Sequence, residues 1–334
     1  PIEPLAEQAT FEECVFLLWN HELPNEEQLA GLRGDLRANQ SVPEEIWNVL
    51  RPLAKRQSLM DLVRTGVSAL SAFDDEVAST REDIPGRDVV ERRVATRLMA
   101  KMGPLVAGAW RLANGDDPLE PRDDLSLAGN FLYLVNGEVP DDAEERIFDA
   151  ALTLHADHGF NASTFAARVT AATESDIYAA VTSAVGTLAG RLHGGANMRV
   201  MRMLEEIGEV ERVDDYIGAI LDKPKGRVMG FGHRVYKVED PRATVLRRMS
   251  KDLTERTGNS KWFQMSLRVE ENVLGRKNIP PNVDFYSASV YASLGLDPEI
   301  FTPIFAVSRA SGWLAHVLEQ HADNRLIRPR ANYV

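Results

Sequence analysis

The 334-residue sequence lacks features that would point to several classes of protein. It contains one cysteine, Cys14, so an internal disulfide framework is excluded, which fits a reducing compartment. Cys14 lies among apolar residues, and we expect a small buried side chain. No uncharged stretch is long enough to span a bilayer, and the first residues, PIEP, show no secretory signal. We therefore predict a cytoplasmic protein with no membrane partner.

Positive charge is also scarce. The chain has 38 lysine and arginine residues against 50 acids, a formal net charge of −12. Repulsion from phosphates then argues against a nucleic-acid partner. One basic island lies between Lys223 and Arg242, and it suits a polyanionic ligand such as the phosphates of a nucleotide-bearing carrier. A solvated surface loop is the alternative.

Strand-like alternation is rare, whereas apolar residues recur at helical spacing in segment after segment. Examples are Phe11, Val15 and Leu18; Val94, Leu98 and Met102; Ile147, Ala151 and Leu154; Val200, Leu204 and Ile207; and Val245, Met249 and Leu253. The sequence therefore predicts a mainly α fold.

The segment RLHGGAN contains the first candidate for chemistry, His193. Asn197 is a plausible N-cap, which places His193 just ahead of a helix N-terminus, where the dipole keeps an imidazole neutral. A neutral ring can still donate one hydrogen bond to a polarised carbonyl oxygen. A histidine in an ordinary glycine loop is the alternative.

Two further segments, GFGHRVYK and PPNVDFYS, contain His233 and Asp284. The first is not a dinucleotide fingerprint, because a third glycine and a preceding strand are missing. In the second, either Asn282 or Asp284 could cap a helix that follows the prolines. A functional Asp284 would instead remove a proton from carbon.

The segment HADHGFN places His155, Asp157 and His158 close together in the sequence. Histidines three apart share a helical face, so a metal-dependent hydrolase is conceivable, although no third ligand has a convincing spacing. A structural role or a substrate contact is the alternative. Near the C-terminus, VSRASGW and IRPR contribute Arg309 and Arg328, and arginine binds carboxylates bidentately.

Taken in this order, the segments closely resemble the citrate synthase family, which includes 2-methylcitrate synthase. The resemblance covers essentially the whole chain. It implies an almost entirely helical homodimer with a large domain at 1–194 and 296–334 and an inserted small domain at 195–295. It also implies condensation of acetyl-CoA with oxaloacetate to citrate and CoA, the entry to the tricarboxylic acid cycle.

The resemblance assigns catalysis to three residues. His193 is expected to hydrogen-bond the thioester carbonyl while Asp284 removes a methyl proton. His233 is expected to polarise the ketone of oxaloacetate and to protonate the developing alkoxide. Carboxylate- and pocket-binding positions are His158, Arg242, Phe305, Arg309 and, from the partner subunit, Arg328. CoA-binding positions are Val228, Met229, Gly230, Phe231, Lys237 and Lys277. No metal and no resident cofactor is implied.

Two alternatives stay open. A 2-methylcitrate synthase would use propionyl-CoA at the same site, and one methylene in an apolar pocket changes binding by only about 1–3 kcal/mol. A non-catalytic helical binding protein would keep the fold without the reaction.

Overall fold

The structure is a computed structural model that describes residues 1–82, 84–232 and 239–332. Over these residues the ordered elements are helices, with no strand longer than an isolated bridge between Phe231 and Pro281. The prediction of a mainly α fold is confirmed. Among the described residues, none of the helices combines the length and apolar character needed to cross a membrane.

The contacts within the chain divide it into two compact units. Unit 1 comprises 1–10, 140–154 and 194–302. Unit 2 comprises 11–139, 155–193 and 303–334. The predicted domain limits remain a prediction.

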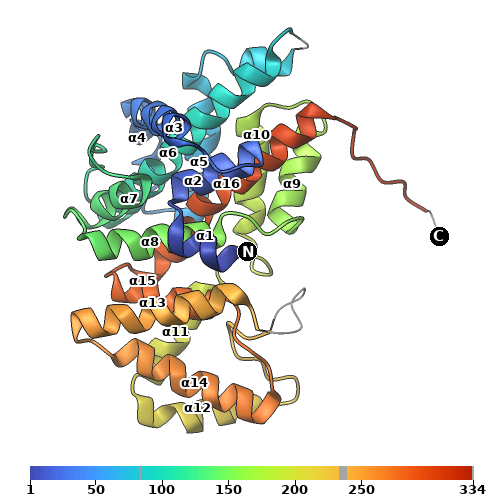
Figure 1. The fold of residues 1–334 in the computed structure, drawn as a ribbon. Coiled ribbons are helices and arrows are strands. Elements are labelled where there is room, and N and C mark those ends of the chain that lie inside the picture. The colour runs from blue at the N-terminus through green and yellow to red at the C-terminus, as the bar shows by residue number, and fades with distance from the viewer. Residues whose placement is uncertain (83, 233–238, 333–334) are drawn as a thin grey trace. The chain divides into compact units, whose positions relative to one another are not determined.

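Unit 1 is built around α13 and α15, which pack against each other; α11 and α14 also pack on α15 (Figure 1). Its helices are α1 (Ile2–Gln8), α8 (Asp142–His155, in unit 1 as far as Leu154), α11 (Ala196–Ile207), α12 (Val213–Leu221), α13 (Pro241–Thr257), α14 (Lys261–Lys277) and α15 (Val283–Ser293), with short 3-10 turns at Val210–Arg212 and Pro298–Ile300. The apolar residues of α15 are almost all buried, so this helix forms the centre of the unit.

Unit 2 has α6 as its longest helix, and the α9–α10 pair packs side by side (Figure 1). Its helices are α2 (Phe11–Asn20), α3 (Glu26–Ala38), α4 (Glu44–Leu50), α5 (Leu59–Leu70), α6 (Arg87–Asn114), α7 (Leu127–Asn136), α9 (Ala162–Ala171), α10 (Ile177–Leu188) and α16 (Phe301–Ala322, in unit 2 from Pro303), with 3-10 turns at Ser71–Phe73 and Ala78–Arg81. Cys14 is buried in α2, as predicted.

Short polar residues fix where many of these helices begin. Ser58, Ser126 and Asp176 each accept a backbone N–H from the first turn of the helix that follows, and Asn25 forms a capping box with Gln28. These helix starts therefore follow local sequence signals.

After α16 the chain runs extended to the last described residues, away from the helices of unit 2 (Figure 1).

Candidate functional site

The half-buried His193 lies in a turn of unit 2, where its backbone N–H donates to Gly190 O at 2.9 Å. Its Nε2 atom lies 2.8 Å from the Ser163 hydroxyl. The backbone N–H of Ser163 also donates to Nε2, at 3.2 Å. A backbone N–H can only donate, so Nε2 acts as an acceptor and the ring proton of the neutral imidazole belongs on Nδ1.

Ser163 is positioned by the start of α9. Asn161 is the N-cap, and its Oδ1 accepts the backbone N–H groups of Ser163 and Thr164, each at 3.1 Å. The Ser163 hydroxyl lies 2.7 Å from the same oxygen and also accepts the indole N–H of Trp313, from α16, at 3.1 Å. The buried Ser163 thus joins α9, α16 and the His193 turn.

Two of the predicted carboxylate- and pocket-binding residues, Arg309 and Phe305, lie together on α16. The Arg309 guanidinium carbon lies 4.5 Å from the centroid of the Phe305 ring, and its Nε donates to His155 O at 2.7 Å. The Arg309 side chain is 2% exposed. A buried guanidinium held by a ring and a carbonyl is preorganised to meet a carboxylate.

Burial lowers the pKa of His193, and the positive charge of Arg309 lowers it further. Both effects favour the neutral imidazole. The neutral state was expected, but from a helix dipole with Asn197 as N-cap. That assignment is wrong: Gly195 precedes α11 in a left-handed conformation, and Asn197 is buried inside the first turn.

The loop at 155–161 lies against α16. At Gly312 a Cβ atom would meet Ala156 O at 2.4 Å, so only glycine allows this approach. His158 follows in this loop and is half-buried. Among the residues that the structure describes, no group of three or more His, Cys, Asp or Glu side chains could hold a metal ion.

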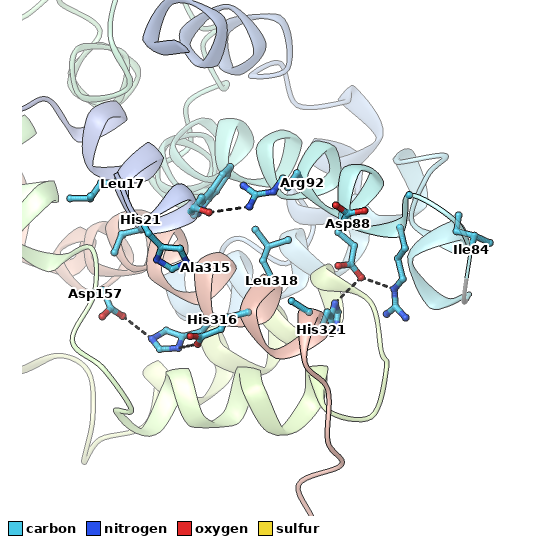
Figure 2. Close-up of a pocket in the computed structure, with 17 residues that line it drawn as sticks. Leu17, His21, Ile84, Asp88, Arg92, Asp157, Ala315, His316, Leu318 and His321 are labelled. Carbon is cyan, nitrogen blue, oxygen red and sulfur yellow. Dashed lines mark hydrogen bonds and ion pairs between the residues drawn. The ribbon is translucent and has the colours of Figure 1, made fainter. Parts of the chain in front are cut away.

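A cavity of about 870 Å³ opens elsewhere in unit 2, lined by α2, the start of α6 and the second half of α16 (Figure 2). Burial acts to raise the pKa of Asp157, but hydrogen bonds from His316 and the Gly159 N–H hold that pKa below its usual value. Figure 2 shows His316 pointing at Asp157. His193, His158 and Arg309 do not line this cavity.

In unit 1, Asp284 lies in the first turn of α15. Asn282 caps this helix by accepting the Asp284 N–H at 3.0 Å. Of the two residues that could have capped, Asn282 does so, and the Asp284 carboxylate is not used as the cap. A carboxylate there is chemically suited to act as a base.

The segment before α15, residues 280–282, is hydrogen-bonded to the loop of residues 230–232. Asn282 N–H donates to Gly230 O at 2.8 Å, Gly232 N–H donates to Pro280 O at 2.9 Å, and the Asn282 amide donates to Gly232 O at 2.8 Å. Gly230 has φ +79°, and a Cβ there would lie 2.8 Å from Phe285 Cβ and from Val200 Cγ2. Glycine at 230 is therefore required for this pairing.

Arg242, another predicted carboxylate ligand, is held by Asp240. The guanidinium donates to both carboxylate oxygens, at 2.9 and 2.8 Å, and both side chains are buried. Asp240 also accepts the backbone N–H of Val283, at 3.2 Å. Burial acts to raise the pKa of Asp240, but the Arg242 bonds overcome it and the pKa lies below its ordinary value. Asp240 thereby ties Arg242 to the start of α15.

The remaining predicted site residues differ in how exposed they are. Val228 is buried, Met229 and Phe231 are half-buried, and Phe231 packs on Phe285 with ring centroids 4.6 Å apart. Lys277 is exposed at the end of α14, and Arg328 is exposed on the C-terminal segment. His233 and Lys237 lie outside the described residues.

Three residues that hold the candidate groups were missed by sequence reasoning: Ser163, Trp313 and Asp240. Ser163 follows the cap signal at Asn161, and Asp240 precedes Pro241, so both helix starts are readable. Their contacts with His193 and with α15 span 30 and 43 residues. No local pattern predicts such contacts.

The family model described as "Citrate synthase, C-terminal domain" matches residues 1–330. The chain belongs to the citrate synthase family. It is 53% identical over 333 residues to a Bacillus subtilis protein named citrate synthase 2, covering 99% of this chain and 88% of the relative. It is 39% identical over 331 residues to another B. subtilis protein, named citrate/2-methylcitrate synthase, covering 99% and 87%.

Among solved structures, citrate synthase from Pyrobaculum aerophilum superposes with a TM-score of 0.93 at 38% identity, covering 100% of this chain and 84% of that one. As a member of the citrate synthase family, the protein is an acyltransferase. The resemblance inferred from the ordered motifs is confirmed.

Proposed function

We propose that the protein condenses acetyl-CoA with oxaloacetate and hydrolyses the resulting thioester, giving citrate and CoA. The observation that carries this proposal is the environment of His193. Its Nε2 accepts the Ser163 N–H, and burial with the Arg309 charge lowers its pKa. The ring is then neutral, with an Nδ1–H that can donate to a thioester carbonyl oxygen.

In the proposed reaction, Asp284 removes one methyl proton from acetyl-CoA while His193 stabilises the negative charge that develops on the carbonyl oxygen. The nucleophilic methylene carbon attacks the ketone carbon of oxaloacetate. His233 gives a proton to the alkoxide that forms. Water then cleaves the citryl thioester and releases CoA.

The carboxylates of oxaloacetate are proposed to meet His158, Arg242, Arg309 and the partner's Arg328. Arg242 and Arg309 are buried in this structure, which supports the role because desolvated guanidinium groups bind carboxylates strongly. Phe305 is proposed to shape the pocket beside Arg309. We propose a homodimer because Arg328 lies on an exposed segment that extends beyond α16.

CoA is proposed to lie against the backbone of Val228, Met229, Gly230 and Phe231, with Lys237 and Lys277 near its phosphates. The hydrogen bonds between residues 230–232 and 280–282 support this arrangement, because they hold the loop beside the start of the Asp284 helix. No metal or resident cofactor is needed for this chemistry. We place the reaction in the cytoplasm, at the entry to the tricarboxylic acid cycle.

A 2-methylcitrate synthase using propionyl-CoA is the second candidate, because one relative is named for both products. The test measures release of free CoA thiol with acetyl-CoA or propionyl-CoA, each with and without oxaloacetate. We expect oxaloacetate-dependent release that is faster with acetyl-CoA. Faster release with propionyl-CoA would favour the second candidate, and no release with either would favour a non-catalytic binding protein.

A further inference from the structure

His316 lies in the second half of α16, and its imidazole contacts the loop of residues 155–161 at two points. Its Nε2 atom lies 3.3 Å from Asp157 Oδ1 (Figure 2). Its ring also meets the Phe160 ring edge to face, with ring centroids 5.4 Å apart. Asp157 and Phe160 lie on either side of His158 in the sequence, and His158 is a proposed ligand of oxaloacetate. One imidazole therefore contacts the chain before and after this ligand.

Arg168, on α9, determines which nitrogen of a neutral His316 ring carries the proton. Its Nη1 lies 3.0 Å from His316 Nδ1, and because a guanidinium can only donate, Nδ1 accepts. The proton of the neutral ring is then on Nε2, the nitrogen that faces Asp157. Arg168 is itself attached to α16, since its Nε donates to Gln320 Oε1 at 3.0 Å and its Nη1 also bonds to Glu319.

Asp157 is partly buried, with a side chain 28% exposed, and it is held ionised. Burial acts to raise its pKa, but His316 and the Gly159 N–H keep that pKa below its ordinary value. The Gly159 N–H donates to Oδ2 from within the loop, at 3.0 Å, so it fixes the shape of the loop rather than its place on α16. His316 faces the other oxygen. Beyond His158 in the chain, the Arg168 guanidinium carbon lies 5.0 Å from the centroid of the Phe160 ring.

The two ends of the loop are held independently of His316. At the start, His155 O accepts the Nε–H of Arg309 at 2.7 Å, and at the end Asn161 caps α9. Loss of the imidazole would therefore leave the loop attached at both ends and would free its middle, residues 157–160.

We propose that His316 is a positioning residue: by contacting both Asp157 and Phe160, it holds the middle of the loop against α16 and so places His158 for a carboxylate of oxaloacetate. In this role His316 does not contact substrate. The effect on oxaloacetate rests on the proposed function, whereas the effect on the loop does not.

The test replaces His316 by Leu, which is apolar and of similar size, and by Gln, whose amide can accept from Arg168 and donate to Asp157. The matched control is His321→Leu. His321 also lies on α16 and is buried, but its Nδ1 lies 2.8 Å from Glu91 Oε1, on α6, so the control makes the same chemical change away from the loop.

Hydrogen exchange followed by mass spectrometry measures the loop without substrate. We expect the peptide that covers residues 157–160 to exchange about fivefold faster in His316→Leu, the effect of losing one polar contact of ordinary strength. His316→Gln and His321→Leu should exchange at the wild-type rate. An unchanged rate in His316→Leu, or an equal acceleration in either of the other two variants, would overturn the proposal. If His316→Leu does not fold, His316→Phe keeps a ring beside Phe160 and removes both nitrogens, and the same outcomes apply.

Binding of oxaloacetate, measured by titration calorimetry, gives a second readout. We expect His316→Leu to bind oxaloacetate about fivefold more weakly and to raise its KM by the same factor, while kcat and the KM for acetyl-CoA change by less than about twofold. His316→Gln should restore the wild-type affinity. Unchanged affinity in a variant whose loop exchanges faster would overturn the proposal. If the wild type neither binds oxaloacetate nor releases CoA, the proposed function fails, while the exchange rates still decide whether His316 holds the loop.

Discussion

In unit 2 the imidazole of His193 is held by the backbone N–H and the hydroxyl of Ser163, and Trp313 donates to that hydroxyl. In unit 1 the start of the Asp284 helix is held mainly by backbone hydrogen bonds and one buried ion pair. Ser163 and Trp313 form the first arrangement. The pairing of residues 230–232 with 280–282, together with Asp240, forms the second. Changes in unit 2 should therefore alter chemistry more than stability, and changes in unit 1 should disturb both.

The largest expected loss of stability comes from Asp240→Asn. This change leaves the Arg242 guanidinium buried, with a side-chain exposure of 5%, and without its anion. Breaking a buried pair in this way costs about 3–5 kcal/mol in the free energy of unfolding. Chemical denaturation measures it, and the control Asp214→Asn, which breaks the exposed pair with Arg268, should change stability much less.

The ion pair between Asp240 and Arg242 also predicts how the free energy of unfolding depends on pH. Because the folded pKa of Asp240 lies below its ordinary value, its stabilisation is present above the unfolded carboxyl pKa and is lost as pH falls through the folded pKa. The stability difference between wild type and Asp240→Asn should therefore shrink in acid. A difference that stays constant from neutral pH to pH of about 3 would contradict this role.

Gly230→Ala tests the backbone pairing of unit 1. The left-handed conformation costs about 1–2 kcal/mol for alanine, and the close contacts with Phe285 and Val200 add about 1–3 kcal/mol. We expect lower stability together with weaker binding of CoA. Gly275→Ala, on α14 with open space around it, should instead be neutral or stabilising by up to about 1 kcal/mol. Equal effects of the two changes would contradict the comparison.

Sequence reasoning predicted the helical segments and the candidate groups better than it predicted what holds them. The start of α15 was predicted from the two prolines before it, with either Asn282 or Asp284 as the cap, because caps and prolines are local signals; the structure shows that Asn282 is the cap. Asn197 was assigned the wrong role because Gly195 precedes it and takes the left-handed conformation. Trp313 and Asp240 act on residues far along the chain, and the fold alone brings those partners together.

Ser163→Ala tests the side-chain arrangement of unit 2. It removes the hydroxyl beside His193 and leaves the Trp313 N–H without that acceptor, which costs about 1–3 kcal/mol. We expect CoA release to slow by about tenfold while the protein stays folded. The control is Ser266→Ala: Ser266 is also fully buried, but its hydroxyl makes no hydrogen bond within the described part of the chain. That control should keep full activity. A matching rate loss in Ser266→Ala would show that the loss of any buried hydroxyl slows the reaction, and Ser163 would then have no specific role beside His193.

The smallest expected effect is on the titration of His193. Burial and Arg309 lower its pKa, so the folded ring should take up a proton at lower pH than the same ring in denaturant. Stability should fall as pH drops through the unfolded value of about 6.5, because the unfolded chain binds the proton first. Histidine NMR signals followed against pH check this. A folded midpoint at or above the unfolded one would contradict it.

A comparison of Asp284→Asn with Asp142→Asn tests whether Asp284 is the base. Asp142 also lies in the first turn of a helix of unit 1, but it has no role in the proposed reaction. With acetyl-CoA and oxaloacetate, we expect Asp284→Asn to lower the rate of CoA release by about 10²–10⁴-fold, the usual contribution of a positioned base, while Asp142→Asn matches the wild type. If Asp284→Asn, folded as the wild type is, released CoA at an undiminished rate, Asp284 would not be the base and the proposed mechanism would be wrong.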